Sequence, residues 1–177
     1  MRKAHRPKTS ENAANSSYVH ILLGLIFKSG ATTKQERRSQ GPNDTEQAYR
    51  STGGRALFAC GSPYDPVKLG GRAFVPRQGN NSYIFPGVGL GAIASGAQRI
   101  TDEMFMSAAR ALANLVSEED LAQGSLYPAL PRIREVSARI AAEVARLAYA
   151  RGLAPGRAPD NLLAHVQSQM YEPSYCS

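Results

Sequence analysis

Two adjacent asparagines, Asn80 and Asn81, are the residues of this chain best suited to bind a ligand. They lie on a turn directly before the apolar run of residues 82–85. An amide side chain offers two hydrogen-bond donors and one acceptor without carrying charge. Such groups suit the recognition of a carboxylate or of a nicotinamide amide inside a site. The pair can equally be a plain turn, because asparagine favours turn conformations.

A glycine-rich run at residues 87–92, with the sequence GVGLGA, has the spacing of a dinucleotide-binding turn. It follows a strand-like segment and begins a helix, as the GxGxxG/A pattern requires. The acidic residue that this pattern places about twenty positions later is missing, because Asp102 and Glu103 come too early. Close packing of two helices through small residues is the simpler interpretation.

A third candidate is the turn that contains Gly61 and Ser62, which ends the compact apolar run of residues 55–60. That run predicts a buried strand. Ligands of open α/β sheets bind at the carboxyl ends of strands, so this turn is placed to line a site. An ordinary strand exit would have the same sequence. Cys60 has no nearby histidine or lysine to activate it, and we expect an inert thiol.

No other residues form a catalytic or metal-binding pattern. The sequence lacks a Walker motif and a GxSxG turn, and its three histidines lack metal-ligand spacing. The acidic residues between positions 102 and 120 fall at predicted helix starts, where they act as caps. We therefore assign no catalytic residue and no metal ligand to this chain. The two cysteines, Cys60 and Cys176, are far apart, which favours a reducing cytoplasm.

The net charge of +7 is concentrated at one end of the chain. Residues 1–41 hold eight basic and two acidic residues, whereas the remainder holds thirteen and twelve. We expect the basic head to be a poorly ordered leader, with binding to an anionic partner as the alternative. The nearly neutral body argues against a nucleic-acid-binding protein. The longest apolar stretch has seven residues, against about twenty for a membrane-spanning helix.

The elements that must position these residues are mostly helices. An apolar stripe of Ile133, Val136, Ile140, Val144 and Leu147 predicts a helix over residues 131–151. A hairpin is predicted at Gly70 and Gly71, and residues 82–85 form a second short strand or extended segment. Further helices are predicted at residues 44–49, 86–98, 102–116 and 118–123, and at 161–170 after an Asp160 cap.

Strands followed by helices indicate a fragment of an α/β fold. The run of residues 56–60 has the composition of a strand buried on both faces, which requires strands on either side. Two predicted strands are too few to form such a sheet. The sequence therefore predicts that further strands come from outside this segment.

Several separate motifs, in order, resemble malic enzyme. The similarity covers residues 45–177, about three quarters of the chain. The motifs are EQAY at 46–49, GRALFACGSPYDPV at 54–67, QGNNSYIFPG at 78–87, ITDEMF at 100–105, GSLYP at 124–128, IREVS at 133–137 and QSQMY at 167–171.

The resemblance implies that residues 42–177 are the C-terminal part of a Rossmann-like NAD(P)-binding domain with a helical tail, preceded by an unrelated leader at 1–41. The family oxidises and decarboxylates malate to pyruvate and CO2 while reducing NAD or NADP, with the help of Mg²⁺ or Mn²⁺. By resemblance, Asn80 and Asn81 bind the malate carboxylate at the nicotinamide end of the site. Gly61 and Ser62 would line the cofactor cleft.

Much of the family's machinery has no counterpart in this sequence. The resemblance places the catalytic tyrosine and lysine, the metal-binding carboxylates and the dinucleotide fingerprint upstream of the matched segment. Asn43 does not align with the family's Asn-Pro-Thr turn, so we assign it no role. We therefore expect a truncated product that is inactive in isolation. The alternative is a non-enzymatic module that pairs with a full-length subunit of this oligomeric family through the stripe at residues 131–151.

Overall fold

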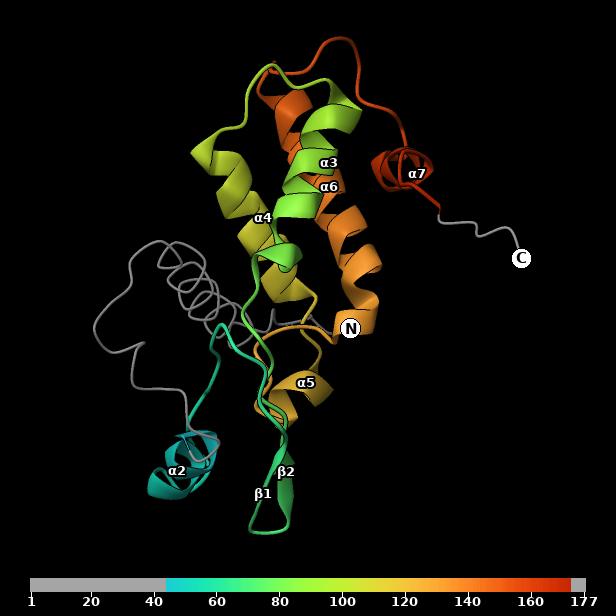
Figure 1. The fold of residues 1–177 in the computed structure, drawn as a ribbon. Helices are drawn as coiled ribbons and strands as arrows, with labels where there is room; N and C mark the ends of the chain where they lie inside the picture. The colour runs from blue at the N-terminus through green and yellow to red at the C-terminus, as the bar shows by residue number, and fades with distance from the viewer. Residues whose placement is uncertain (1–43, 173–177) are drawn as a thin grey trace, which may run out of the picture.

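The computed structural model describes residues 44–172, which are mainly helical with one small sheet (Figure 1). Predictions for the basic head, for Asn43 and for Cys176 lie outside these residues. The α-helices are α2 (Asp44–Ser51), α3 (Phe85–Ser95), α4 (Asp102–Asn114), α5 (Glu118–Ala122), α6 (Ile133–Ala150) and α7 (Leu162–Ser168). The shorter elements are β1 (Val67–Leu69), β2 (Arg72–Phe74) and the 3₁₀ helices η3 (Asn81–Tyr83) and η4 (Leu130–Arg132).

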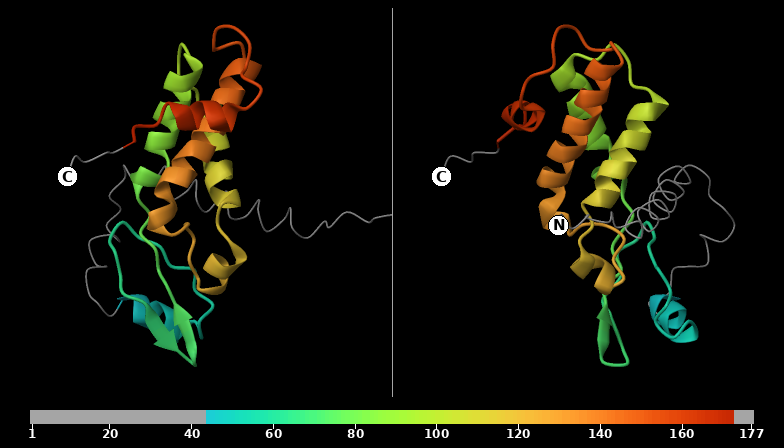
Figure 2. Two further views of the ribbon diagram at one scale, coloured as in Figure 1. Left: turned by 90° about the vertical axis from the view of Figure 1, so that its right-hand side faces the viewer. Right: turned by 180° about the vertical axis from the view of Figure 1, so that it is seen from behind.

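Helices α3, α4 and α6 form a bundle that contains the main core, and α7 lies across α6 (Figure 2). The predicted stripe of α6 is confirmed, because Val136, Ile140 and Val144 are fully buried. It faces α3 and α4 of the same chain. The stripe is therefore not available to pair with another subunit, and that part of the alternative hypothesis is wrong.

The glycines of α3 allow this helix to approach α6 closely. A Cβ added at Gly91 would lie 2.6 Å from the carbonyl oxygen of Ala141, and one added at Gly87 would lie 2.7 Å from the Cβ of Ile140. Only glycine fits such a contact between two helices without displacing the backbone. The GVGLGA run is therefore a helix-packing motif in this structure, and its backbone is not presented to a pyrophosphate.

Residues 55–59 belong to no helix or strand, so the prediction of a buried strand is wrong for the described residues. A lone parallel bridge joins Cys60 to Gln78, and the only sheet in residues 44–172 is the β1–β2 hairpin. The α/β layout is thus only partly formed. The helices need no distant partner for their backbone hydrogen bonds, whereas a parallel sheet needs several chain segments.

Two smaller predictions are also corrected. Residues 82–85 do not form a strand, because Asn80 caps η3 and Pro86 lies in the first turn of α3. Proline favours that position since its missing N–H is not needed there. Helix α7 is capped by Asn161, whose side chain accepts a hydrogen bond from the backbone N–H of Ala164, and not by Asp160. The predicted capping box at Ser117 and Asp120 is confirmed.

The hairpin joins β1 and β2 in antiparallel register, with Val67 opposite Phe74. Its two-residue turn has positive φ angles of 59° at Gly70 and 79° at Gly71, as the sequence predicts. Phe74 stacks on Tyr49 of α2 with a centroid distance of 4.4 Å, which attaches this helix to the hairpin. Among the described residues, no helix combines the length and apolar character needed to span a lipid bilayer.

Candidate functional site

Two turns that the sequence marks as separate candidates lie side by side in the structure. The backbone N–H of Gly79 donates to the carbonyl of Cys60 at 2.8 Å. The side-chain amide of Gln78 donates to the carbonyl of Gly61 at 2.6 Å. These two bonds hold the Gly61–Ser62 turn against the turn that carries Asn80 and Asn81. The two candidate turns are therefore neighbours in the fold.

The two asparagines have different surroundings. The side-chain oxygen of Asn80 accepts a hydrogen bond from the backbone N–H of Ser82 at 2.9 Å and caps η3. The side chain of Asn81 is exposed and has no hydrogen-bond partner among residues 44–172. Asn80 thus fulfils the turn role that asparagine favours, while its NH2 group is left over. Asn81 keeps its whole amide available for a ligand.

A hollow of about 370 Å³ lies beside the paired turns. Its lining combines polar side chains, among them Asn80 and Ser82, with apolar ones. Ser62 is exposed at the neighbouring turn, where its carbonyl accepts a hydrogen bond from the Cys60 thiol at 3.2 Å. The lining residues are Pro63, Arg77, Gln78, Asn80, Ser82, Tyr83, Ala129 and Leu130.

Two buried tyrosines support the floor of the site. The rings of Tyr83 and Tyr127 stack at 5.2 Å, and the Tyr83 hydroxyl donates to the Pro128 carbonyl at 2.7 Å. Burial, with a smaller contribution from Tyr83, raises the pKa of Tyr127 to about 12. Burial also raises the pKa of Tyr83, although Arg77 partly opposes it. Both phenols stay neutral near neutral pH and act as packing groups.

Arg77 connects Tyr127, one of the two stacked tyrosines, to α5. Its Nη1 atom donates to the Tyr127 carbonyl at 2.6 Å and lies 2.7 Å from the Oδ1 atom of Asp120. Burial alone would raise the pKa of Asp120, but hydrogen bonds from Ser117 and the pairing with Arg77 together lower it. Both groups are therefore charged and mutually neutralised. Sequence reasoning missed Arg77, because no local pattern links residue 77 to an acid in a helix cap.

The described residues do not provide a metal site. Residues 44–172 contain no cluster of three or more histidine, cysteine, aspartate or glutamate side chains with the geometry to hold an ion. Asp120, which pairs with the lining residue Arg77 through Oδ1, accepts the backbone N–H of Ser117 through Oδ2. A divalent cation needs several free oxygen ligands, so Asp120 could not hold one in this arrangement.

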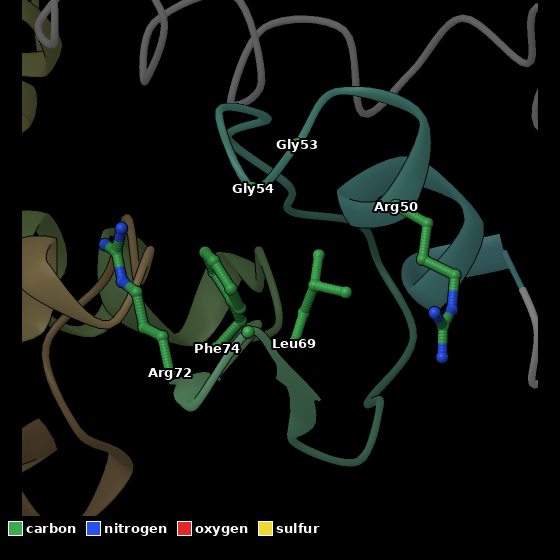
Figure 3. A pocket seen from close by; sticks show the side chains of 7 residues that line it. Arg50, Gly53, Gly54, Leu69, Arg72 and Phe74 are labelled. Atoms are coloured by element: carbon green, nitrogen blue, oxygen red, sulfur yellow. The ribbon is translucent and has the colours of Figure 1, made fainter.

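A second hollow, of about 450 Å³, lies between α2 and the hairpin. Figure 3 shows Leu69 and Phe74 between two arginine side chains, Arg50 and Arg72. Arg50 pairs with Glu46 at 2.6 Å. Arg72 donates to the Ala122 carbonyl and lies over the Phe74 ring at 4.7 Å. Both guanidinium groups are engaged in local contacts, so we interpret this hollow as part of the hairpin–helix packing.

Comparison with known proteins identifies the family. Residues 31–149 match the model described as malic enzyme, NAD binding domain. The chain belongs to the malic enzyme family. The NADP-dependent malic enzyme of Populus trichocarpa is 51% identical over 138 residues, which are 77% of this chain and 23% of that protein. That of Vitis vinifera is 50% identical over 176 residues, 99% of this chain and 28% of that protein.

These matches also correct a boundary. The NADP-dependent malic enzyme of Dictyostelium discoideum is 50% identical over 167 residues, 94% of this chain and 30% of that protein. Matches of this length, and a family model that starts at residue 31, extend the similarity into the basic head. The similarity to the family therefore includes residues before 42, whereas the motif resemblance placed its start at residue 45. The chain spans 23–30% of the length of these curated relatives.

Proposed function

We propose that this chain is the part of a malic enzyme that binds malate and the nicotinamide end of the cofactor. The complete enzyme would oxidise malate, transfer its hydride to NAD or NADP, and release pyruvate and CO2. The observation that carries this proposal is the unpartnered Asn81 amide on a turn held against Gly61 and Ser62. Membership of the malic enzyme family supports it.

Asn81 and the remaining NH2 group of Asn80 are suited to orient a carboxylate. Each amide N–H can donate to a carboxylate oxygen, and hydrogen bonds to a charged acceptor are stronger than neutral ones. Gly61 has no side chain to exclude a nicotinamide ring, and Ser62 adds a hydroxyl beside it. The cofactor, when bound, supplies the hydride acceptor, and NADP is favoured by the names of the similar enzymes.

The described site has no group suited to general acid–base catalysis. Such a group works best when its pKa lies near the operating pH. The pKa values of Tyr83 and Tyr127 are raised above the ordinary tyrosine range, and that of Asp120 is lowered below the ordinary aspartate range. We therefore propose that the isolated chain is inactive. The Mg²⁺ or Mn²⁺ of the family would need ligands from outside residues 44–172, and we assign none.

A chimera tests the proposed site. The whole chain would replace the matching 176-residue region of the Vitis vinifera enzyme. We expect malate-dependent NADP reduction, and we expect Asn81→Ala to lower kcat/KM by about 10²-fold, as loss of an orienting hydrogen bond to a charged group in a closed site does. Asn114→Ala, at an exposed position on α4, is the matched control. Unchanged kcat/KM in both Asn80→Ala and Asn81→Ala would refute the assignment.

Assembly of the full-length enzyme as a homo-oligomer and its cytoplasmic location remain proposals that rest on the sequence. The exposed apolar side chains of α3 are compatible with assembly. The free thiol of Cys60 is compatible with the cytoplasm. Gel filtration of the chimera, with the native grape enzyme run beside it, would test the assembly. A chimera that elutes as a monomer beside an oligomeric grape enzyme would count against it.

A further inference from the structure

We propose that Arg77 is a positioning residue for the turn that carries Asn80 and Asn81. Its guanidinium group fixes the main chain of Tyr127, on which this turn rests. The inference rests on the proposed function, because it explains how Asn81 is presented to the malate carboxylate. Arg77 acts through this support, and we assign it no contact with the substrate.

The first observation is that the Asn81 side chain has no support of its own. It is exposed and makes no hydrogen bond within residues 44–172. Within the same residues, the Asn80 side chain bonds only inside the turn, where its oxygen accepts from the Ser82 N–H at 2.9 Å. The direction in which the Asn81 amide points is therefore set by the main chain on either side of it.

The second observation is that both sides of the turn rest on Tyr127 and Pro128. Before the turn, a Cβ added at Gly79 would lie 3.1 Å from the Tyr127 hydroxyl oxygen, so the main chain lies against the end of this side chain. After the turn, the Tyr83 ring stacks on that of Tyr127 at a centroid distance of 5.2 Å. The Tyr83 hydroxyl donates to the Pro128 carbonyl at 2.7 Å. A displacement of Tyr127 would therefore move both ends of the turn.

The third observation is that Arg77 holds Tyr127 in place. The Nη1 atom of Arg77 donates to the Tyr127 carbonyl at 2.6 Å and lies 2.7 Å from Oδ1 of Asp120. The Arg77 and Asp120 side chains are only 18% and 11% exposed, so water screens this ion pair weakly. Asp120 is fixed in turn, because its other oxygen accepts the Ser117 N–H in the capping box of α5. The helix cap thus locates the guanidinium group, which locates Tyr127.

The hairpin has other attachments to the same part of the chain, which separates the role of Arg77 from general stability. Arg72 and Val75 are hydrogen-bonded to residues 122–125, through the side chain and the main chain respectively. Arg77 lies beyond these contacts and only two residues before Gly79. Loss of its guanidinium group should therefore displace the turn without releasing the hairpin.

Nuclear magnetic resonance of the full chain tests this positioning. Arg77→Met keeps the alkyl stem and removes the guanidinium group. We expect it to shift the side-chain NH2 signals of Asn80 and Asn81. It should also speed hydrogen exchange of the Gly79 N–H about tenfold, because a hydrogen bond from a charged group is lost from the support. Arg72→Met removes an arginine–carbonyl bond at the hairpin, so it is the matched control and should leave both quantities unchanged.

A second variant protects this test against a general loss of structure. Arg77→Met leaves the Asp120 carboxylate without its partner, which can weaken the fold. The double variant Arg77→Met/Asp120→Asn leaves no unpaired charge, and its amide oxygen can still accept the Ser117 N–H. It should keep its helices by circular dichroism and show the same shift of the Asn81 signals as Arg77→Met.

A double-mutant cycle in the chimera tests the functional consequence. With Asn81 present, Arg77→Met should lower kcat/KM about tenfold, because a displaced amide orients the carboxylate less well. In the Asn81→Ala background it should lower kcat/KM by less than about threefold, because the group that Arg77 positions is already gone. A loss caused only by weaker folding would be equal in the two backgrounds. Arg72→Met should leave kcat/KM unchanged in both.

The outcomes separate this inference from the proposed function. Unchanged Asn81 signals in Arg77→Met, or equal losses of kcat/KM in the two backgrounds, would overturn the inference and leave the proposed site intact. An inactive chimera, or full activity of both Asn80→Ala and Asn81→Ala, would count against the proposed function instead. Shifted Asn81 signals in Arg77→Met would then still support the positioning of the turn.

Discussion

The helical bundle and the run of residues 55–60 are both rich in apolar residues. Only the bundle makes its backbone hydrogen bonds and apolar contacts within itself. In α3, α4 and α6 the backbone bonds are made within each helix, and the apolar stripes meet one another. Residues 57–59 have the composition of a strand but pair with no strand among residues 44–172. The difference teaches that a segment of an α/β domain can keep its helices, because their hydrogen bonds are local, and lose its sheet, because strand hydrogen bonds are not.

Truncating one leucine in each region tests most directly whether the two regions differ in packing. Leu112 is fully buried in the bundle, whereas Leu57 is 49% exposed in the run of residues 55–60. We expect Leu112→Ala to lower the free energy of unfolding by about 3 kcal/mol, because it leaves a cavity. Leu57→Ala should lower it by less than about 1 kcal/mol. Urea denaturation followed by circular dichroism measures both, and equal losses would show that this run is packed as tightly as the bundle.

Two glycines on α3 test how closely this helix approaches α6. We expect Gly91→Ala to destabilise the chain by about 2 kcal/mol, because the new methyl group meets the Ala141 carbonyl oxygen at 2.6 Å. A Cβ added at Gly89 would meet no atom within 4 Å beyond the backbone of its own helix, so Gly89→Ala should stabilise the chain by about 0.5–1 kcal/mol through helix propensity. The two urea midpoints should move in opposite directions. A stabilising Gly91→Ala would contradict the close approach of α3 to α6.

The link between site and bundle can be tested through pH. The folded pKa of Asp120 is lower than its unfolded value, so its pairing with Arg77 stabilises the chain above about pH 4, and this contribution is lost as the pH falls further. We expect Asp120→Asn to cost about 2 kcal/mol at pH 7 and progressively less below pH 4. Unfolding midpoints at several pH values measure this loss. Asp65→Asn, at an exposed position, is the matched control.

The smallest effect is expected at the surface of the bundle. Arg151 donates to Glu103 at 2.9 Å, and this hydrogen bond lowers the pKa of the exposed carboxyl. Both side chains are at least half exposed, so water and salt screen the pair. Arg151→Ala should shift the unfolding midpoint less than any variant above, with no further shift in 1 M salt. A shift as large as that of Asp120→Asn would mean that the surface contributes to the bundle as much as the site does.

Sequence reasoning succeeded where structure is set locally. The period of the α6 stripe, the Ser117–Asp120 capping box and the Gly70–Gly71 turn depend on neighbours within a few residues, and each was predicted correctly. The strand at residues 55–60 was predicted from composition that suits a sheet, but a strand exists only when another segment pairs with it. That neighbouring strands come from outside this segment stays a prediction.

The candidate site was predicted only in part. Asn80, Asn81, Gly61 and Ser62 were identified from turn chemistry and from the family resemblance, and their roles in binding remain predictions. That the two turns touch could not be derived from spacing, because the Gly79–Cys60 and Gln78–Gly61 bonds join segments far apart in the chain. Arg77 and the stacked tyrosines were missed for the same reason.

The most direct measurement is the absorbance of NADPH at 340 nm when the purified chain is mixed with malate, NADP and Mn²⁺. Our account predicts no malate-dependent increase, because the pKa values of Tyr83, Tyr127 and Asp120 at the described site are shifted away from neutrality and residues 44–172 contain no metal-binding cluster. Steady NADPH production by the isolated chain would contradict it. That result would mean that this chain forms a complete catalytic centre by itself.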